Sequence, residues 1–345
     1  MKTDLRQGKS KGRVEYKLNS LKGKKILITG GLGFIGSNLA HKCLRLGAKI
    51  TIFDNLNLNS GGNIYNIHDI KNSIKIVKGN ILNYQEIIAN ISDKDIIFNC
   101  AASSSHPFSM RKPLLDLDVN NRGVINLLEA VRRFNPEIRF IQLGTTTQLG
   151  KLLYKPADEL HPEFTTDIYS ANKSAAEKYV LIYGKTYSIP VVVIRLPNVF
   201  GPRACINNSE VTFVNYFIGL VLQKKDITIF GDGKQLRNLI YVDDCIKALI
   251  MAAQNKKVND EVLFATGDEH YSVAKIAQMI SKYVGSCKVK FIRWPRGRKA
   301  IEVGDAVISN EKIKRILGWY PQVSLEEGLI KTRKYYQKCL KYYFK

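Results

Sequence analysis

The glycine-rich stretch GGLGFIGS at residues 30–37 constrains the fold more than any other feature of this sequence. It joins an apolar run at 24–30, which predicts a strand, to a pattern at 34–47 that predicts a helix ending at Gly47. Glycines at such a junction let the backbone turn tightly and approach a pyrophosphate, whose charge then lies at the helix N-terminus. The junction therefore predicts a dinucleotide-binding loop. Two spacings are satisfied together, Gly31-x-Gly33-x-x-Gly36 and Gly30-x-x-Gly33-x-x-Gly36.

The rest of the first half alternates short apolar runs with helical patterns. Such alternation implies right-handed crossovers, and so an α/β fold with a Rossmann-type, doubly wound parallel sheet. Further strands are expected at 48–54, 73–79, 95–101, 139–144 and 190–196, and helices at 116–134 and 168–187.

After Gly201-Pro202 the alternation gives way to loops, a helix and a short apolar segment. This change predicts a smaller mixed α/β C-terminal lobe for the substrate. We expect a basic extension at 1–20, a cofactor-binding domain at 21–200 with 238–256 returning to it, and the lobe over 201–345.

Charge is the unusual part of the composition, with 53 Lys and Arg against 30 Asp and Glu, a formal net charge of +23. Such an excess can indicate binding to nucleic acid or to an anionic membrane. The basic residues are spread along the chain, however, and no nucleic-acid-binding signature accompanies them. We therefore expect neither partner, and a basic surface also suits a diphosphate ligand.

Cysteine spacing and apolar runs bear on location. The six cysteines are widely spaced, without a C-x-x-C pair, which fits neither a zinc site nor a disulfide framework. No run reaches the roughly 18 apolar residues of a membrane span. Residues 1–20 lack the apolar stretch of a signal peptide. These features predict a cytoplasmic protein without a metal site.

Asp54 closes the second expected strand. A carboxylate there accepts hydrogen bonds from an adenosine ribose and repels a 2′-phosphate, which favours NAD over NADP as the cofactor. The structural alternative is that the glycines only allow close helix–strand packing and that Asp54 caps a turn.

Tyr169 and Lys173 are four residues apart in the helix expected at 168–187, so they share a face. A phenol is a poor base at neutral pH, but a nearby ammonium and the positive ring of an oxidised nicotinamide lower its pKa. Tyr169 could then remove a hydroxyl proton while the carbon loses hydride. Alone, the pair is also consistent with a solvated helix surface; the upstream glycine loop favours the catalytic interpretation.

Together, the glycine loop, the Tyr-x-x-x-Lys pair and a Ser/Thr at a strand end between them resemble the extended short-chain dehydrogenase/reductases. The similarity is to the nucleotide-sugar epimerase/dehydratase family, with UDP-glucose 4-epimerase-like features, and covers about residues 21–335. It includes AASSSHPFSMRKPLLDLDVNNRGVINLLEA (101–130), RLPNVFGPR (195–203), GDGKQLRNLIYVDD (231–244) and LGWYPQVSLEEGL (317–329).

The resemblance implies roles for residues that match the family's motifs. Thr145, five residues before Gly150, would hydrogen-bond the oxygen being oxidised and complete a catalytic set with Tyr169 and Lys173. Asn120 would support the active-site helix through its amide. The implied NAD contacts are Gly30, Gly33, Phe34, Ile35, Gly36, Asp54, Asn55, Asn80, Ile81, Ala101, Ala102, Asn120, Tyr169, Lys173 and Pro197. The implied substrate contacts are Thr145, Asn198, Phe230, Arg237 and Asp305, with Arg237 gripping the diphosphate.

Several positions depart from the family pattern. Leu149 replaces a Tyr, Asn80 stands where an Asp often contacts the adenine, and Asn238 follows Arg237 in place of Asp. Glu302 replaces an Arg that is the second diphosphate ligand; Arg296 or Arg298 could substitute for it. These departures leave the sugar and the nucleotide open.

Two further residues could carry chemistry. His106 could act as an acid or base, but the motif offers it no partner, so a substrate-loop or structural role is favoured. Cys205 could donate a proton, but nothing nearby in the sequence marks it as a thiolate, which favours a small loop residue.

Thr146 and Thr147 occupy positions where the family's dehydratases carry Asp and Glu. Oxidation at C4 could begin here, but elimination would lack its acid. We therefore expect an NAD-dependent nucleotide-diphosphate-sugar 4-epimerase acting on a UDP-sugar, by transient C4 oxidation and return of hydride to the opposite face. Alternatives are a sugar 2-epimerase, a 4-ketosugar reductase, a non-catalytic NAD-binding protein or a nucleic-acid-associated protein. The resemblance also implies a homodimer formed by the helices at 116–134 and 168–187.

Overall fold

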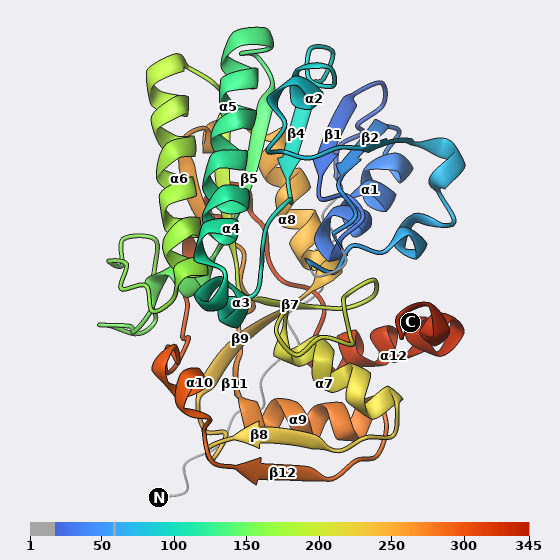
Figure 1. Cartoon of the computed structure of the whole chain (residues 1–345), viewed down its shortest axis with the longest axis vertical. Helices are drawn as coiled ribbons and strands as arrows, with labels where there is room; N and C mark the ends of the chain where they lie inside the picture. The colour runs from blue at the N-terminus through green and yellow to red at the C-terminus, as the bar shows by residue number, and fades with distance from the viewer. Residues whose placement is uncertain (1–17, 58–59, 345) are drawn as a thin grey trace, which may run out of the picture.

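The computed structural model describes residues 18–57 and 60–344, so most of the basic extension expected at 1–20 lies outside the described residues. Its centre is a seven-stranded sheet in the order β10-β6-β5-β4-β1-β2-β3, in which all pairs are parallel (Figure 1). The predicted doubly wound α/β fold is thus confirmed. The strands are β1 (Lys25–Thr29), β2 (Lys49–Asp54), β3 (Lys75–Lys78), β4 (Ile96–Asn99), β5 (Arg139–Thr145), β6 (Val191–Leu196) and β10 (Glu261–Phe264).

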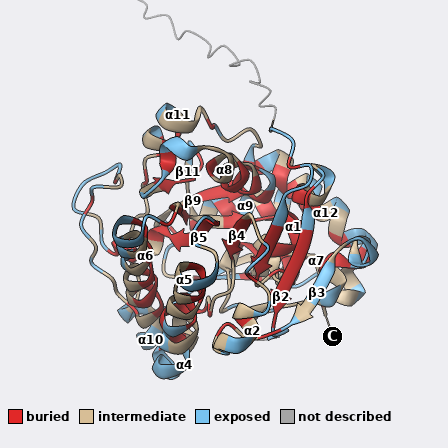
Figure 2. Ribbon diagram, turned by 90° about the horizontal axis from the view of Figure 1, so that it is seen from above, coloured by how far each residue is buried: buried red, intermediate tan, exposed pale blue. Residues whose placement is uncertain are grey.

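Helices cover both faces of this sheet, so its central strands are buried on both sides, as the red strands of Figure 2 show. Side chains alternate between the faces: Ile26 and Ile28 belong to one core, and Leu27 belongs to the other. The first core packs against α1 (Phe34–Arg45) and α8 (Val242–Gln254), and the second against α2 (Tyr84–Ile88), α5 (Gly123–Phe134) and α6 (Ile168–Tyr187).

The helix expected at 116–134 is interrupted. It is divided into α4 (Pro113–Leu117), a π-helical turn at Asp118–Arg122, and α5. The turn holds two buried asparagines, and Asn120 donates from its amide to the carbonyl of Ser103 outside the helix. Insertions of this kind are common at functional sites.

The C-terminal lobe contains two small sheets, in the orders β11-β9-β7 and β12-β8 (Figure 1). Of the segment 238–256, the strand part lies in the first small sheet, whereas α8 packs against α1, β5 and β6 of the central sheet. β10, which was not expected, then adds a seventh strand beside β6. The small sheets consist of β7 (Asn198–Phe200), β8 (Ile227–Phe230), β9 (Leu236–Tyr241), β11 (His270–Ser272) and β12 (Val289–Ile292). The remaining α-helices are α3 (His106–Arg111), α7 (Phe213–Leu222), α9 (Val273–Tyr283), α10 (Arg296–Ala300), α11 (Glu311–Leu317) and α12 (Leu325–Cys339).

Neither a candidate membrane span nor a candidate metal-binding cluster occurs among the described residues. None of their helices has the length and apolar character needed to cross a membrane. Within the same residues, no group of three His, Cys, Asp or Glu side chains could hold a metal ion.

Candidate active site

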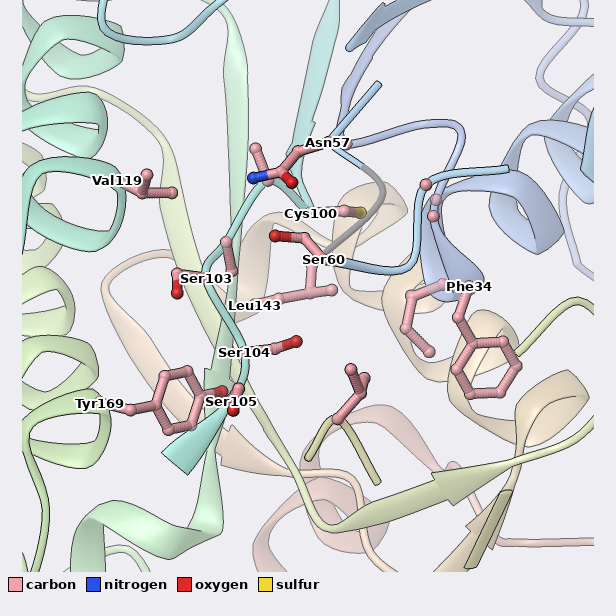
Figure 3. Close-up of a pocket in the computed structure, with 18 of the residues that line it drawn as sticks. Phe34, Asn57, Ser60, Cys100, Ser103, Ser104, Ser105, Val119, Leu143 and Tyr169 are labelled. Atoms are coloured by element: carbon pink, nitrogen blue, oxygen red, sulfur yellow. The ribbon is translucent and has the colours of Figure 1, made fainter. Parts of the chain in front are cut away.

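A cavity of about 530 Å³ lies where the carboxyl ends of the parallel strands meet the C-terminal lobe (Figure 3). β1 has β4 on one side and β2 on the other, so the order in which successive strands join the sheet reverses at this point, although all of them run parallel. Open α/β sheets bind ligands at such a switch point. Figure 3 shows Tyr169 of α6 on one side of the cavity and Phe34 of α1 on the other.

The glycine loop after β1 is shaped so that side chains are excluded. A Cβ at Gly30, where φ is +64°, would lie 2.7 Å from the Ala101 amide nitrogen, and one at Gly36 would lie 2.4 Å from the Gly30 carbonyl oxygen. α1 follows directly, and no side chain of the described residues caps its N-terminus. Its first amides are thus free to bind a pyrophosphate.

Asp54 lies at the end of β2, and its carboxylate faces the same cavity. It accepts hydrogen bonds from the backbone amides of Leu32 and Leu56, at 2.9 and 2.8 Å. Burial raises its pKa above the ordinary range, although these two hydrogen bonds oppose the shift. The uncapped helix and this carboxylate together fit the pyrophosphate and the ribose of NAD.

Tyr169, Lys173 and Thr145 meet in the cavity wall, and all three are buried. The Thr145 hydroxyl hydrogen-bonds to the Tyr169 phenol and lowers its pKa, but burial dominates and holds the pKa of Tyr169 above its usual value. Burial lowers the pKa of Lys173 to about 8, and its Nζ donates to the Leu143 carbonyl at 2.6 Å. We expected the charge of Lys173 to lower the pKa of the phenol; in this structure burial of Tyr169 raises it instead.

The family model for the NAD-dependent epimerase/dehydratase family matches residues 26–274. The chain belongs to this family. A putative UDP-glucose 4-epimerase of Methanocaldococcus jannaschii is 31% identical, over 88% of this chain and 95% of the relative. UDP-glucuronic acid decarboxylase 1 of Xenopus tropicalis is also 31% identical, over 92% of this chain and 73% of the relative. A UDP-glucose 4-epimerase from Thermotoga maritima, solved with UDP-glucose, is 28% identical with a TM-score of 0.84, over 92% of this chain and 99% of that one.

Family membership agrees with the cofactor expected from the sequence, NAD. Apart from Asn120, every residue predicted to contact NAD lines the cavity. Asn120 is buried. Its side-chain oxygen accepts a hydrogen bond from the backbone amide of Ser103, and its side-chain nitrogen donates to the Ser103 carbonyl and to Asp116. Its predicted support of α6 is indirect, because it is Asp116 that accepts a hydrogen bond from Asn172 of that helix.

The predicted substrate residues are not all brought together. Thr145 and Asn198 line the cavity, whereas Phe230, Arg237 and Asp305 are not among its lining residues. The ring of Phe230 lies beside Trp294, with centroids 5.6 Å apart. Asp305 accepts hydrogen bonds from Lys155 and from the Leu236 amide.

Arg237 is paired within the protein. Its Nη2 lies 2.5 Å from Glu302 Oε1, and its Nη1 donates to the Gly304 carbonyl at 2.5 Å. Glu302, which stands where the family resemblance led us to expect an arginine, thus pairs with Arg237 and neutralises its charge. Of the two candidate substitutes, Arg298 has a charge that acts on Glu210, a residue of the cavity wall.

The sequence interpretation missed the partner of His106. The His106 ring lines the cavity, and its Nδ1 lies 2.7 Å from Asp167 Oδ2. Asp167 directly precedes the predicted helix, where an Asp is a common N-cap, and this position was the signal available in the sequence. Cys205 shows no such activation, since burial raises the pKa of its thiol.

Proposed function

We propose that the protein is an NAD-dependent nucleotide-diphosphate-sugar 4-epimerase, acting on a UDP-sugar. The observation that carries this proposal is the juxtaposition of Thr145, Tyr169 and Lys173 beside Thr146 and Thr147. The hydroxyl and phenol can serve a C4 oxidation, whereas both positions at which related dehydratases hold acids are threonines.

Each residue of the set has a distinct task. Tyr169 takes the proton of the C4 hydroxyl and later returns it to the ketone oxygen, and Thr145 hydrogen-bonds the same oxygen. Lys173, one turn along α6, favours the phenolate whenever its own ammonium is charged. Bound NAD would supply the hydride acceptor for C4 and the hydride donor for the reverse step. It would be held by the glycine loop, the α1 amides and Asp54.

Relatives with other reactions define the competing outcomes. They include UDP-glucuronic acid decarboxylases and a CDP-paratose 2-epimerase. The test is incubation with UDP-glucose, UDP-galactose, UDP-N-acetylglucosamine and UDP-glucuronate, followed by separation of the products. We expect a C4 epimer, no carbon dioxide and no net consumption of added NADH. Release of carbon dioxide, or stoichiometric use of NADH, would contradict the epimerase proposal.

We also propose a homodimer. Apolar side chains are exposed on α4 and α6, including Leu114 at 76% and Ile182 at 56%. Exposed apolar patches of this kind commonly mark protein interfaces. Light scattering should give twice the chain mass for the wild type and a lower mass for Leu114→Glu combined with Ile182→Glu.

The cysteines are all free thiols, which supports the expected cytoplasmic location.

A further inference from the structure

His106 is held close to the Tyr169 phenol. Its ring centroid lies 4.8 Å from that of Tyr169, with the rings nearly perpendicular at 77°. Ser109 of α3 links this helix to α6, since its hydroxyl donates to the His106 carbonyl in α3 and accepts from the Tyr169 amide in α6. The imidazole is therefore fixed beside the group expected to contact the sugar's C4 oxygen.

Asp167 orients this imidazole. Its side chain is 1% exposed; Oδ2 faces His106 Nδ1, and Oδ1 accepts from the Ser170 amide at 2.8 Å. Burial alone would raise the pKa of Asp167, but the hydrogen bonds from His106 and Ser170 outweigh it and keep the pKa below its ordinary value. An ionised carboxylate at Nδ1 places the proton of a neutral imidazole there, so that Nε2 carries the free electron pair.

The Nε2 atom is available. No hydrogen bond to it is found among residues 18–57 and 60–344, and the His106 side chain is 31% exposed at the cavity wall. The neighbouring charges engage each other instead, since Arg111 and Glu210 form two hydrogen bonds of 3.0 and 2.8 Å. A carboxylate that orients a histidine with a free nitrogen is the arrangement of a general base.

A line of hydroxyl groups joins this pair to the catalytic set. Ser170 Oγ lies 3.2 Å from both Asp167 Oδ2 and Thr147 Oγ1, and Thr147 Oγ1 lies 3.0 Å from Thr145 Oγ1. Thr147, which stands where a dehydratase would have an acid, thus connects Thr145 to the His106–Asp167 pair. The His106–Asp167 pair thus belongs to the same hydrogen-bonded line as the threonine stretch.

We propose that His106, oriented by Asp167, is a second acid–base group that removes and returns the proton on a carbon next to the C4 ketone. The proposal rests on the proposed function only in taking a 4-ketosugar nucleotide as the species bound in the cavity.

The step balances within the site. Nε2 takes the proton from C3 or C5, the C–H electron pair forms a C=C bond to C4, and the carbonyl π pair moves to O4. The Tyr169 phenol and the Thr145 hydroxyl hydrogen-bond the resulting enolate oxygen. The imidazolium exchanges its proton with water, and the reverse step then places a solvent proton on the same carbon.

The test supplies the ketone directly. NAD-loaded protein is mixed with UDP-4-keto-6-deoxyglucose in D₂O, and the proton NMR signals of H3 and H5 are followed. We expect one of them to disappear faster than in buffer, and His106→Gln to slow this exchange by roughly 10²–10⁴-fold, the usual contribution of a general base. The matched control is His68→Gln, because His68 is an exposed histidine with its Nδ1 at the Tyr65 carbonyl.

Asp167→Asn separates orientation from folding, because asparagine caps a helix about as well as aspartate. This variant should keep the wild-type melting temperature, slow the exchange and shift the ¹⁵N resonances of the His106 ring. Exchange no faster than in buffer, or equal rates for the wild type and His106→Gln, would overturn the proposal. Because no C4 oxidation is needed, these outcomes are independent of whether UDP-sugars are epimerised.

Discussion

Replacing Glu302 by glutamine should strengthen the binding of UDP, because the change releases Arg237 from an ion pair. The two side chains lie 2.5 Å apart and are only 12% and 24% exposed, for Arg237 and Glu302 respectively. The Gly304 carbonyl, which also accepts from Arg237, would stay in the variant and keep the guanidinium in place. A diphosphate that binds Arg237 in the wild type must first displace the carboxylate.

The size of the effect follows from this contact. A hydrogen bond to a charged group contributes about 1.5–3 kcal/mol net. We take the lower end, because Glu302 is partly exposed and screened by solvent. Since 1.4 kcal/mol corresponds to a factor of ten, we expect the Kd for UDP to fall about tenfold in Glu302→Gln.

The assay is calorimetric titration of the NAD-loaded protein with UDP. Asp232→Asn is the matched control: it removes the same charge from an exposed turn of the lobe, where Asp232 pairs with Lys234 at 3.5 Å. A gain no larger than that of the control would refute the reasoning, as would a gain that survives when Arg237→Ala is added to Glu302→Gln.

Three further predictions concern the cavity. Tyr169→Phe should lower kcat by roughly 10²–10⁴-fold without changing the circular dichroism spectrum; retained turnover would exclude the phenol as the base. Gly36→Ala should lose bound NAD, measured by release on denaturation, because its Cβ would lie 2.4 Å from the Gly30 carbonyl oxygen. The pKa of Lys173 is about 8 in the folded state, below its ordinary value of 10.5. At a pH between these two values the unfolded chain therefore binds more protons than the folded one. The unfolding free energy of the wild type, relative to Lys173→Met, should therefore rise from pH 8 to about 10.5; a difference that stays flat contradicts the shift.

Local rules made part of this structure readable from the sequence. The glycine loop needs only a strand, a tight turn and a helix in succession, and the Tyr169–Lys173 pair needs only the spacing of one helical turn. Both lie in the predicted places, and both line the cavity.

The remaining features depend on contacts between distant segments. His106 and Asp167 are 61 residues apart, and Arg237 and Glu302 are 65 apart. Neither pair has a spacing that a sequence pattern can detect. The docking of α3 on α6 brings His106 to Asp167, and the packing of β9 against the loop after α10 brings Arg237 to Glu302. β10 was missed for a similar reason: it lies beyond the regular alternation of the first half, and only its pairing with the distant β6 makes it part of the central sheet.

The position of β10 limits how this protein can be divided or recombined. The chain leaves the central sheet after β6, builds part of the lobe, and returns through α8 and β10 before completing the lobe. Cutting the chain near residue 200 would take away β10 and leave β6 as an unpaired edge, which invites aggregation. The lobe is therefore not a module that can be exchanged between relatives by one crossover. A change of substrate specificity in this chain is therefore expected to need individual substitutions at the cavity or in the lobe beside it, where Glu302 pairs with Arg237.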